Sequence, residues 1–492
     1  MSKRTQFLFL FAGVFLFLLF FGLCESKLWE VDELQTYLIG LKCYTTHTWP
    51  YFGPDVNGNE SSFQSQIPGA LEGILFYISF TLFPIPEGPF IMINLMTAFS
   101  AAILAWYIQK RLPKLSFPLV YIWICLTPWV LHKNTYVITS PFFFLASILF
   151  FVGFMETLPE FSMKLVPARW CNAAMGFSLF FIMQFHFSYV YFLPLSAYAL
   201  FIQMKNSRKP TALLYFIAGA LPMIALIVPT FIKYGMTRAN VASGFAVPFY
   251  LYNFKEWLTI LARYLSLVCF ELPRFIGHDT AERMDFLKSH PWLALPGMLL
   301  WVAGIAQVFV LLFCWFKKPH LLPKWKWLPN LIFALVLGGL IFNNSLTHVQ
   351  SLVGIVLMVA GRVYLARKPL AWFEKPSPLK GWKEIKLFIL LVFLMIWVSF
   401  WFTIKGPISH LYLVFYPWLM LYSCYCWSFF ADSPRWRMRT KIFLALAFYF
   451  HVGHALVRAP QDGIWTHRDS IVRALAEKNY HLMGERRPGS FY

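Results

Sequence analysis

Two adjacent carboxylates and a nearby tyrosine, Asp32, Glu33 and Tyr37, are the residues in this sequence whose types and spacing best suit chemistry. They follow an apolar run over residues 7–23, which is long enough to cross a bilayer. Only 13% of the chain is charged, so acids beside a hydrophobic segment are an informative feature. A carboxylate at the membrane surface suits a general base acting on a hydroxyl or amine, a role that contributes roughly 10²–10⁴-fold. A solvated acidic loop without chemistry is the alternative.

The composition indicates an integral membrane protein. Hydrophobic residues make up 59% of the 492 residues and aromatic residues 20%, well above the apolar share of a soluble domain. The net charge of +20 does not indicate nucleic-acid binding, because the basic residues cluster in short connections between apolar runs. The eight cysteines are scattered without a CxxC pair and are interpreted as buried apolar residues.

The apolar runs predict an all-α integral membrane protein with about 13 transmembrane helices in a domain over residues 1–457. The first run is expected to be a retained signal anchor. Residues 24–87 and 233–290 are predicted to be extracytoplasmic loops that contain helices, and 458–492 a short extracytoplasmic tail. The later spans are expected at 88–109, 117–132, 136–155, 171–187, 188–204, 211–232, 291–316, 328–343, 347–366, 385–404, 408–430 and 441–457.

Charges in the short connections predict the orientation. With the N-terminus inside, the connections that contain Arg111, Lys209, Lys318 and Lys441 all lie on the cytoplasmic side, where basic residues are enriched. An odd number of spans then leaves the tail outside with the two long loops. Chemistry is therefore expected on the extracytoplasmic face.

The side of the membrane limits the substrate. Nucleotide sugars are cytoplasmic, so a sugar donor outside the cytoplasm is expected to be lipid-linked through phosphate. Such a donor needs cations for its phosphate and an apolar groove for its tail.

The segment that begins with Asp32-Glu33 resembles the first outer loop of GT-C glycosyltransferases, most nearly the protein O-mannosyltransferases and bacterial lipid A aminoarabinose transferases. The similarity runs through Thr48-Trp49-Pro50 and Gly53-Pro54 to the stretch from Gln66 to Leu71. The resemblance implies a GT-C-like helical bundle in the bacterial inner membrane. It also implies an inverting transfer from a polyprenyl-phosphate sugar donor to an extracytoplasmic lipid, glycan or protein acceptor. Asp32 would then be the general base and Glu33 its neighbour in the site. Whether the reaction uses a divalent metal ion stays open.

The sequence departs from that family at one position that bears on the donor. Aminoarabinose transferases carry Glu-Lys-Pro where this chain has Gln66-Ile67-Pro68, so the cation for the phosphate is expected from elsewhere. The candidates are Lys405, His410, Arg274 and Arg263, with Lys42 as a further supply. Tyr37, Asp55, Gln66 and Glu72 are the candidates for contacts with substrate.

Other functions are compatible with a multispanning protein. A transporter or flippase of lipid-linked saccharides predicts charged residues within the spans, and a polysaccharide polymerase or a non-catalytic scaffold is also open. His451 and His454 lie three residues apart in the last span, but the neighbouring sequence has no acid or cysteine. These two histidines are therefore expected to pack or to form a hydrogen bond, and no residue is assigned as a metal ligand.

Overall fold

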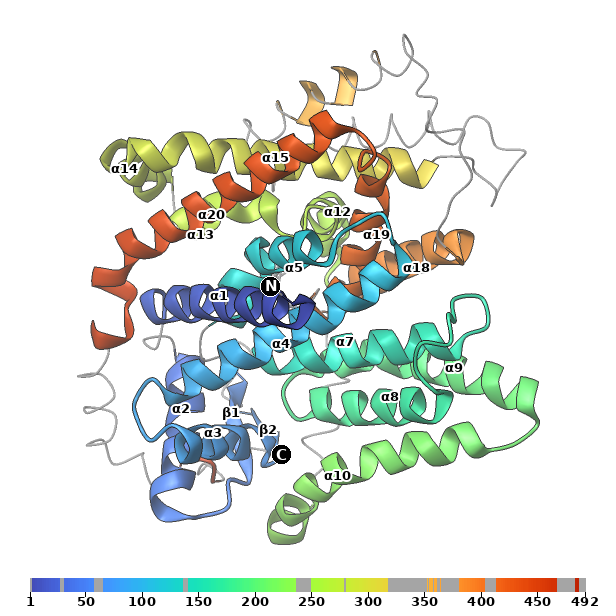
Figure 1. The fold of residues 1–492 in the computed structure, drawn as a ribbon. Helices are drawn as coiled ribbons and strands as arrows, with labels where there is room; N and C mark the ends of the chain where they lie inside the picture. The colour runs from blue at the N-terminus through green and yellow to red at the C-terminus, as the bar shows by residue number, and fades with distance from the viewer. Residues whose placement is uncertain are drawn as a thin grey trace. The chain divides into compact units, whose positions relative to one another are not determined.

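The computed structural model describes residues 2–26, 31–56, 65–135, 140–235, 249–277, 280–316, scattered positions between 352 and 363, 380–402, 413–466 and 483–485. These parts are almost entirely helical, which confirms the prediction of an all-α architecture at the level of class. The chain divides into two compact units (Figure 1). One contains residues 1–104, 130–247 and 454–492, and the other contains 105–129 and 248–453.

Within the described ranges, five helices are long and apolar enough to cross a membrane by length and composition. They cover Arg4–Cys24, Gly88–Arg111, Thr211–Tyr234, Pro291–Leu312 and Pro434–Thr466. Large apolar side chains on their outer faces are exposed, as the 79% exposure of Ile232 illustrates. An apolar surface of this kind suits lipid and not water. The chain is thus a helical membrane protein.

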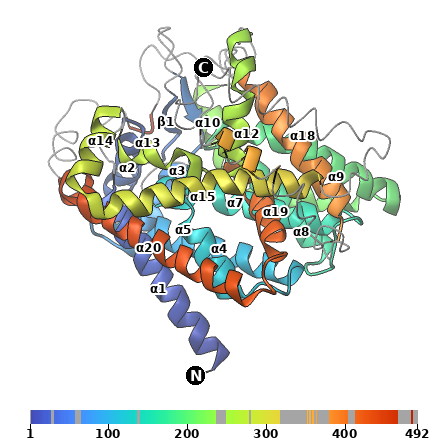
Figure 2. The same ribbon diagram turned by 90° about the horizontal axis from the view of Figure 1, so that it is seen from above.

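The first unit starts with helix α1 (Lys3–Cys24), whose N-terminal end extends beyond the other helices of that unit (Figure 2). Its remaining elements are α2 (Val31–Thr46), β1 (Phe52–Val56), β2 (Ser65–Pro68), α3 (Leu71–Leu82), the first part of α4 (Gly88–Arg111), most of α6 (Pro128–Asn134), α7 (Ser140–Thr157), α8 (Ala168–Met183), the 3₁₀ helix η1 (Phe187–Tyr191), α9 (Phe192–Ser207) and α10 (Thr211–Tyr234).

Helices α2 and α3 pack together through aromatic side chains and one glycine. The ring of Tyr37 meets Phe80 edge-on at 5.3 Å between centroids, and Tyr44 lies 6.4 Å from Tyr77. Gly40 lies directly against Phe76, so a side chain there would collide with the facing helix. This pair, with the β1–β2 hairpin, forms the first predicted outer loop (Figure 1).

Helices α7, α8 and α10 lie side by side in the same unit (Figure 1). Gly176 of α8 lies against the backbone of Phe216, and Gly219 of α10 lies against Ala173. Small residues at such crossings let two backbones approach closely, which is how helices associate where water supplies no hydrophobic driving force.

The second unit contains α5 (Phe117–Leu126), η2 (Leu251–Glu256), α12 (Trp257–Leu265), η3 (Cys269–Glu271), α13 (Leu272–Ile276), α14 (Thr280–Ser289), α15 (Pro291–Phe316), α18 (Trp382–Phe400), α19 (Tyr416–Ser428) and most of α20 (Pro434–Asp462). Helix α19 is buried on nearly every side, as expected of a helix that is apolar all round. Its Tyr422 hydroxyl donates to the Leu311 carbonyl of α15 at 2.7 Å, which fastens the two helices.

Several predicted spans differ in detail from the observed helices. The run at 117–132 is divided at Thr127 into α5 and α6, and the run at 188–204 opens with the 3₁₀ turn η1. The span at 291–316 matches α15. The helix-containing loop predicted at 233–290 has, from residue 251 to 271, a series of short helices, η2, α12 and η3. The span at 328–343 and most of 347–366 fall outside the described residues.

The β1–β2 hairpin was not predicted, because its turn-rich sequence favours a loop. Phe52 pairs with Pro68 and Asp55 with Gln66, with an irregularity between the two pairs. Proline is tolerated at such irregular or edge positions of a strand.

Candidate functional site

Asp32 and Glu33 lie in the first turn of α2, the helix that follows α1 after a short connection. Acidic residues suit that position, because the N-terminal end of a helix carries partial positive charge from its unsatisfied N–H groups. The side chain of Asp32 is outside the described part of the structure. The structure therefore describes the backbone of the carboxylate pair in a helix, while the role of Asp32 stays a prediction.

Glu33 and Glu72 are both buried, although they come from different helices of the first unit. The Thr36 hydroxyl, one turn along α2 from Asp32, donates to Glu72 Oε1 at 3.2 Å. A buried carboxylate is tolerated where hydrogen bonds compensate for lost hydration. Helix α3 thereby brings a second acidic residue to the α2 helix that carries the acidic pair.

Tyr37 was a candidate for contact with substrate, and its observed contacts are structural. The side chain is almost fully buried, and its hydroxyl donates to the Pro86 carbonyl at 3.0 Å. The tyrosine therefore fastens α2 to the turn that follows α3.

Asp55 and Gln66, the other predicted contact residues of this loop, are brought together as partners across the β1–β2 hairpin. Their side chains lie outside the described structure. The following Gly69 has a φ of +134°, a backbone conformation that residues other than glycine rarely adopt. Its N–H donates to the Tyr51 carbonyl at 3.0 Å. This glycine closes the hairpin and directs the chain into α3.

The predicted phosphate ligands belong to the second unit. Arg263 forms an ion pair with Glu271 through its Nε, 2.6 Å from Oε1, so it neutralises a buried carboxylate within its own unit. Arg274 is in α13 with its side chain outside the description, and Lys405 and His410 also fall outside the described residues. Their role as phosphate ligands remains a prediction.

A buried cluster of Glu25, His132 and His454 lies just beyond the C-terminal end of α1 (all three in the first unit). His454 Nδ1 is 2.5 Å from Glu25 Oε1, and His132 Nδ1 is 3.4 Å from Oε2. The expectation that His454 lacks an acidic partner is therefore wrong. Glu25 is 429 positions away in sequence, and only the folded chain brings it to the last helix.

The electrostatics of Glu25 follow from this arrangement. Burial acts to raise the pKa of its carboxyl group, but the charges and hydrogen bonds of His454 and His132 outweigh burial and hold that pKa well below its usual range. Glu25 is therefore an ionised carboxylate, 2% exposed, held between two imidazoles. Nothing near Glu25 in sequence marks this pairing, although an acid at the end of an apolar run is itself a signal.

A divalent metal was left open at the sequence level. Among the residues that the structure describes, no three His, Cys, Asp or Glu side chains are arranged to hold a metal ion.

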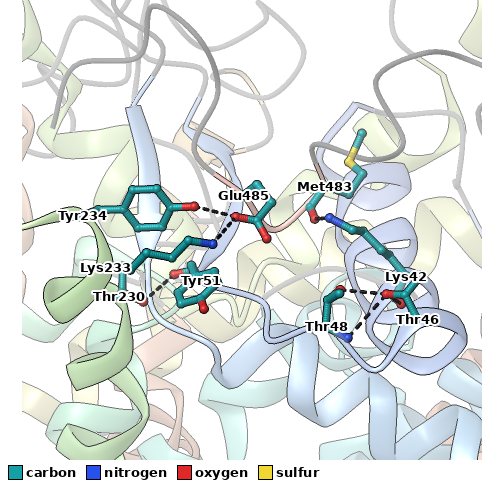
Figure 3. Close-up of polar contacts among 9 residues, drawn as sticks. All are labelled: Lys42, Thr46, Thr48, Tyr51, Thr230, Lys233, Tyr234, Met483 and Glu485. Carbon is teal, nitrogen blue, oxygen red and sulfur yellow. Dashed lines mark hydrogen bonds and ion pairs between the residues drawn. The ribbon is translucent and has the colours of Figure 1, made fainter.

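A second group of polar residues lies around Lys42 of α2, Lys233 at the end of α10, and Glu485 (Figure 3). Lys233 Nζ is 3.1 Å from Glu485 Oε2, and the Tyr234 hydroxyl donates to the same oxygen at 2.5 Å. Only Lys42 was considered from the sequence. The others are far from it in the sequence, so no local pattern could identify them.

These features define a class, that of helical membrane proteins with an acidic pair in the first turn of the helix that follows the first apolar helix. Comparisons with protein families, with curated proteins and with solved structures found no match.

Proposed function

We propose that this chain is an inverting membrane glycosyltransferase of the GT-C type, which moves a sugar from a polyprenyl-phosphate donor to an extracytoplasmic lipid, glycan or protein acceptor. The proposal includes about 13 transmembrane helices, a location in a bacterial inner membrane and an active site on its outer face. It rests chiefly on one observation. The Asp32-Glu33 pair opens a helix that begins only a few residues after a membrane-length apolar helix.

In this mechanism Asp32 takes the proton from the acceptor hydroxyl or amine as it attacks the anomeric carbon. The bond from that carbon to the phosphate oxygen breaks, and the lipid phosphate leaves with the electron pair. Glu33 and Glu72, both buried on the same pair of helices, supply the negative field in which a positively charged sugar transition state is stabilised. Lys405, His410, Arg274 and Arg263 stay the proposed cations for the phosphate.

The test compares Asp32→Asn and Glu33→Gln with wild type in a transfer assay on purified protein. Asp32→Asn changes the side chain by one atom and removes the base, so turnover should fall by about 10²–10⁴-fold while donor binding persists. Glu33→Gln should have the smaller effect. Asp285→Asn provides a matched control, because Asp285 is exposed on α14.

The reverse order of effects would exchange the roles of the two acids. Normal turnover in both variants would mean that the pair takes no part in the transfer. Mass spectrometry of envelope lipids and glycans, from cells with and without the gene, would identify the sugar and acceptor.

A transporter of lipid-linked saccharides is the second candidate, and the Glu25–His132–His454 cluster favours it. Buried titratable groups within a membrane protein are typical of proton-coupled transport. That function predicts saccharide movement across vesicles that depends on a pH gradient and survives Asp32→Asn. A transferase predicts a covalent product that Asp32→Asn abolishes.

A further inference from the structure

Three residues near the C-terminus, Met483, Gly484 and Glu485, lie on the first outer loop and on the end of α10, within one unit (Figure 3). The Gly484 carbonyl accepts hydrogen bonds from the Tyr51 and Phe52 N–H groups at 2.8 and 3.1 Å. The Met483 carbonyl accepts one from Lys42 Nζ at 2.9 Å. Each of the three residues is thus held by a polar contact, and we name residues 483–485 the C-terminal strap.

The strap places a carboxylate among donors. Glu485 Oε2 accepts from both Lys233 and Tyr234 (Figure 3). Lys233 Nζ also lies 4.0 Å from the centre of the Tyr51 ring, a distance typical of a cation–π contact. Ammonium and phenol groups are the donors that bind phosphate oxygens as well as carboxylates.

The Glu485 carboxylate interacts with both lysines, through a hydrogen bond with Lys233 and through charge attraction with Lys42. Lys42 is only 8% exposed, and the pKa of its ammonium group is lowered from the usual value. Burial is the largest cause; the negative charge of Glu485 opposes it, and the positive charge of Lys233 adds to it. Lys42, Lys233 and Glu485 together carry a formal charge of +1 when all are ionised. Lys42 reaches the backbone of the strap and Lys233 its carboxylate, so a single anion with more oxygens could accept from both lysines.

The site is at the depth of the membrane surface. Lys233 and Tyr234 are the last residues of an apolar helix that is long enough to span a bilayer. Phosphate headgroups lie at that depth, where lysine and tyrosine side chains are enriched at the ends of membrane helices. Lys42 is ten residues along α2 from Asp32, about 15 Å at the rise of an α-helix. This second site is therefore distinct from the acidic pair.

We propose that Lys42, Lys233 and Tyr234 form a binding site for a phosphate group at the membrane surface, and that Glu485 of the C-terminal strap occupies it until phosphate displaces it. The site stands on these contacts and does not depend on sugar transfer. Oε2 of Glu485 takes the place of a phosphate oxygen, and the strap acts as a competing ligand within the chain. Gly484 suits this role, because its φ of +75° disfavours any side chain and a Cβ would come within 3.3 Å of Pro50.

Binding to the full-length purified protein tests the proposal. One arm titrates inorganic phosphate, and the other measures association with vesicles of phosphatidylcholine with or without phosphatidic acid. Saturable binding of inorganic phosphate identifies a free phosphate as a ligand, whereas dependence on phosphatidic acid alone identifies a lipid headgroup. No binding in either arm would overturn the proposal.

Substitutions distinguish phosphate binding at this site from a general attraction of phosphate to positive surface charge. Glu485→Gln removes the competing charge and should raise phosphate affinity about tenfold, whereas Lys233→Met should lower it by a similar factor. Lys233→Arg should restore binding, and Lys209→Met, an exposed lysine at the other end of α10, should have no effect. Equal affinity of wild type, Glu485→Gln and Lys233→Met would overturn the site.

Amide hydrogen exchange tests displacement of the strap directly. The Tyr51 and Phe52 N–H groups donate to Gly484, so phosphate should speed their exchange in wild type. Glu485→Gln should show faster exchange at these amides before phosphate is added. Phosphate binding without any change at these two amides would overturn the role of the strap.

Discussion

At the scale of single residues, Glu25 has the most consequential contacts in the first unit. It connects the end of α1 to His132 of α6 and His454 of α20. Removing one partner of such a buried group leaves the others without compensation for lost hydration. The cluster therefore holds the first apolar helix to the last one.

Glu25→Gln should lower the free energy of unfolding by about 3 kcal/mol at neutral pH. The folded-state pKa of Glu25 is below that of an unfolded glutamate, so its ionised form stabilises the fold above about pH 4.3. That contribution is lost as the pH falls through the lower, folded-state pKa. Thermal unfolding in detergent, measured against pH, should therefore show the gap between wild type and variant closing in acid.

Glu160→Gln is the matched control, since Glu160 is exposed in the same unit and its loss should change the melting temperature little at any pH. A gap for Glu25→Gln that stays constant down to strongly acid pH would contradict an ionic role for the cluster.

At the scale of elements, the close crossing of α8 and α10 depends on residues without bulk. Gly219 lies against the backbone of Ala173 and Gly176 against that of Phe216, so neither position has room for a side chain. Because α10 also ends in Lys233 and Tyr234, its packing positions one side of the proposed phosphate site.

Gly219→Leu should force the two helices apart and destabilise the protein by about 1–3 kcal/mol or more. The melting temperature in detergent measures this effect. Gly13→Leu in α1 is the control, because no atom lies within 4 Å of a Cβ built at Gly13. Equal melting temperatures for the two variants would argue against close packing at this crossing.

At the scale of the whole molecule, the topology depends on the distribution of charge between spans. The basic connections predict a cytoplasmic N-terminus and an extracytoplasmic C-terminus. The proposed contact of the strap with the outer loop requires both to lie on the same side of the membrane.

Reporter fusions test this topology. Fusions after Arg111, Lys209, Lys318 and Lys441 should report the cytoplasm, and a fusion after Tyr492 should not. A cytoplasmic signal from the last fusion would contradict the odd number of spans and would separate the tail from the first outer loop.

The sequence by itself determined the class of the protein and the position of most described helices. Apolar runs are local, and a backbone in a membrane must satisfy its own hydrogen bonds, so such runs predict helices directly. The span predicted at 291–316 matches α15. Hydropathy alone misses the division at Thr127, where Pro128 moves the preceding residue out of the helical conformation. The β1–β2 hairpin depends on contacts that no run of hydropathy contains.

Only the tertiary structure decided which polar residues meet. Glu25 finds His454 across 429 positions, and Lys42 finds the Met483 carbonyl across 441. Taken alone, each partner has an ordinary local sequence: one is a histidine in a span and the other a lysine in a helix. Such sequences are equally compatible with simple packing. The pairing arises because a buried charge must be compensated, and the partner that compensates it is chosen by the packing of the helices and not by proximity along the chain.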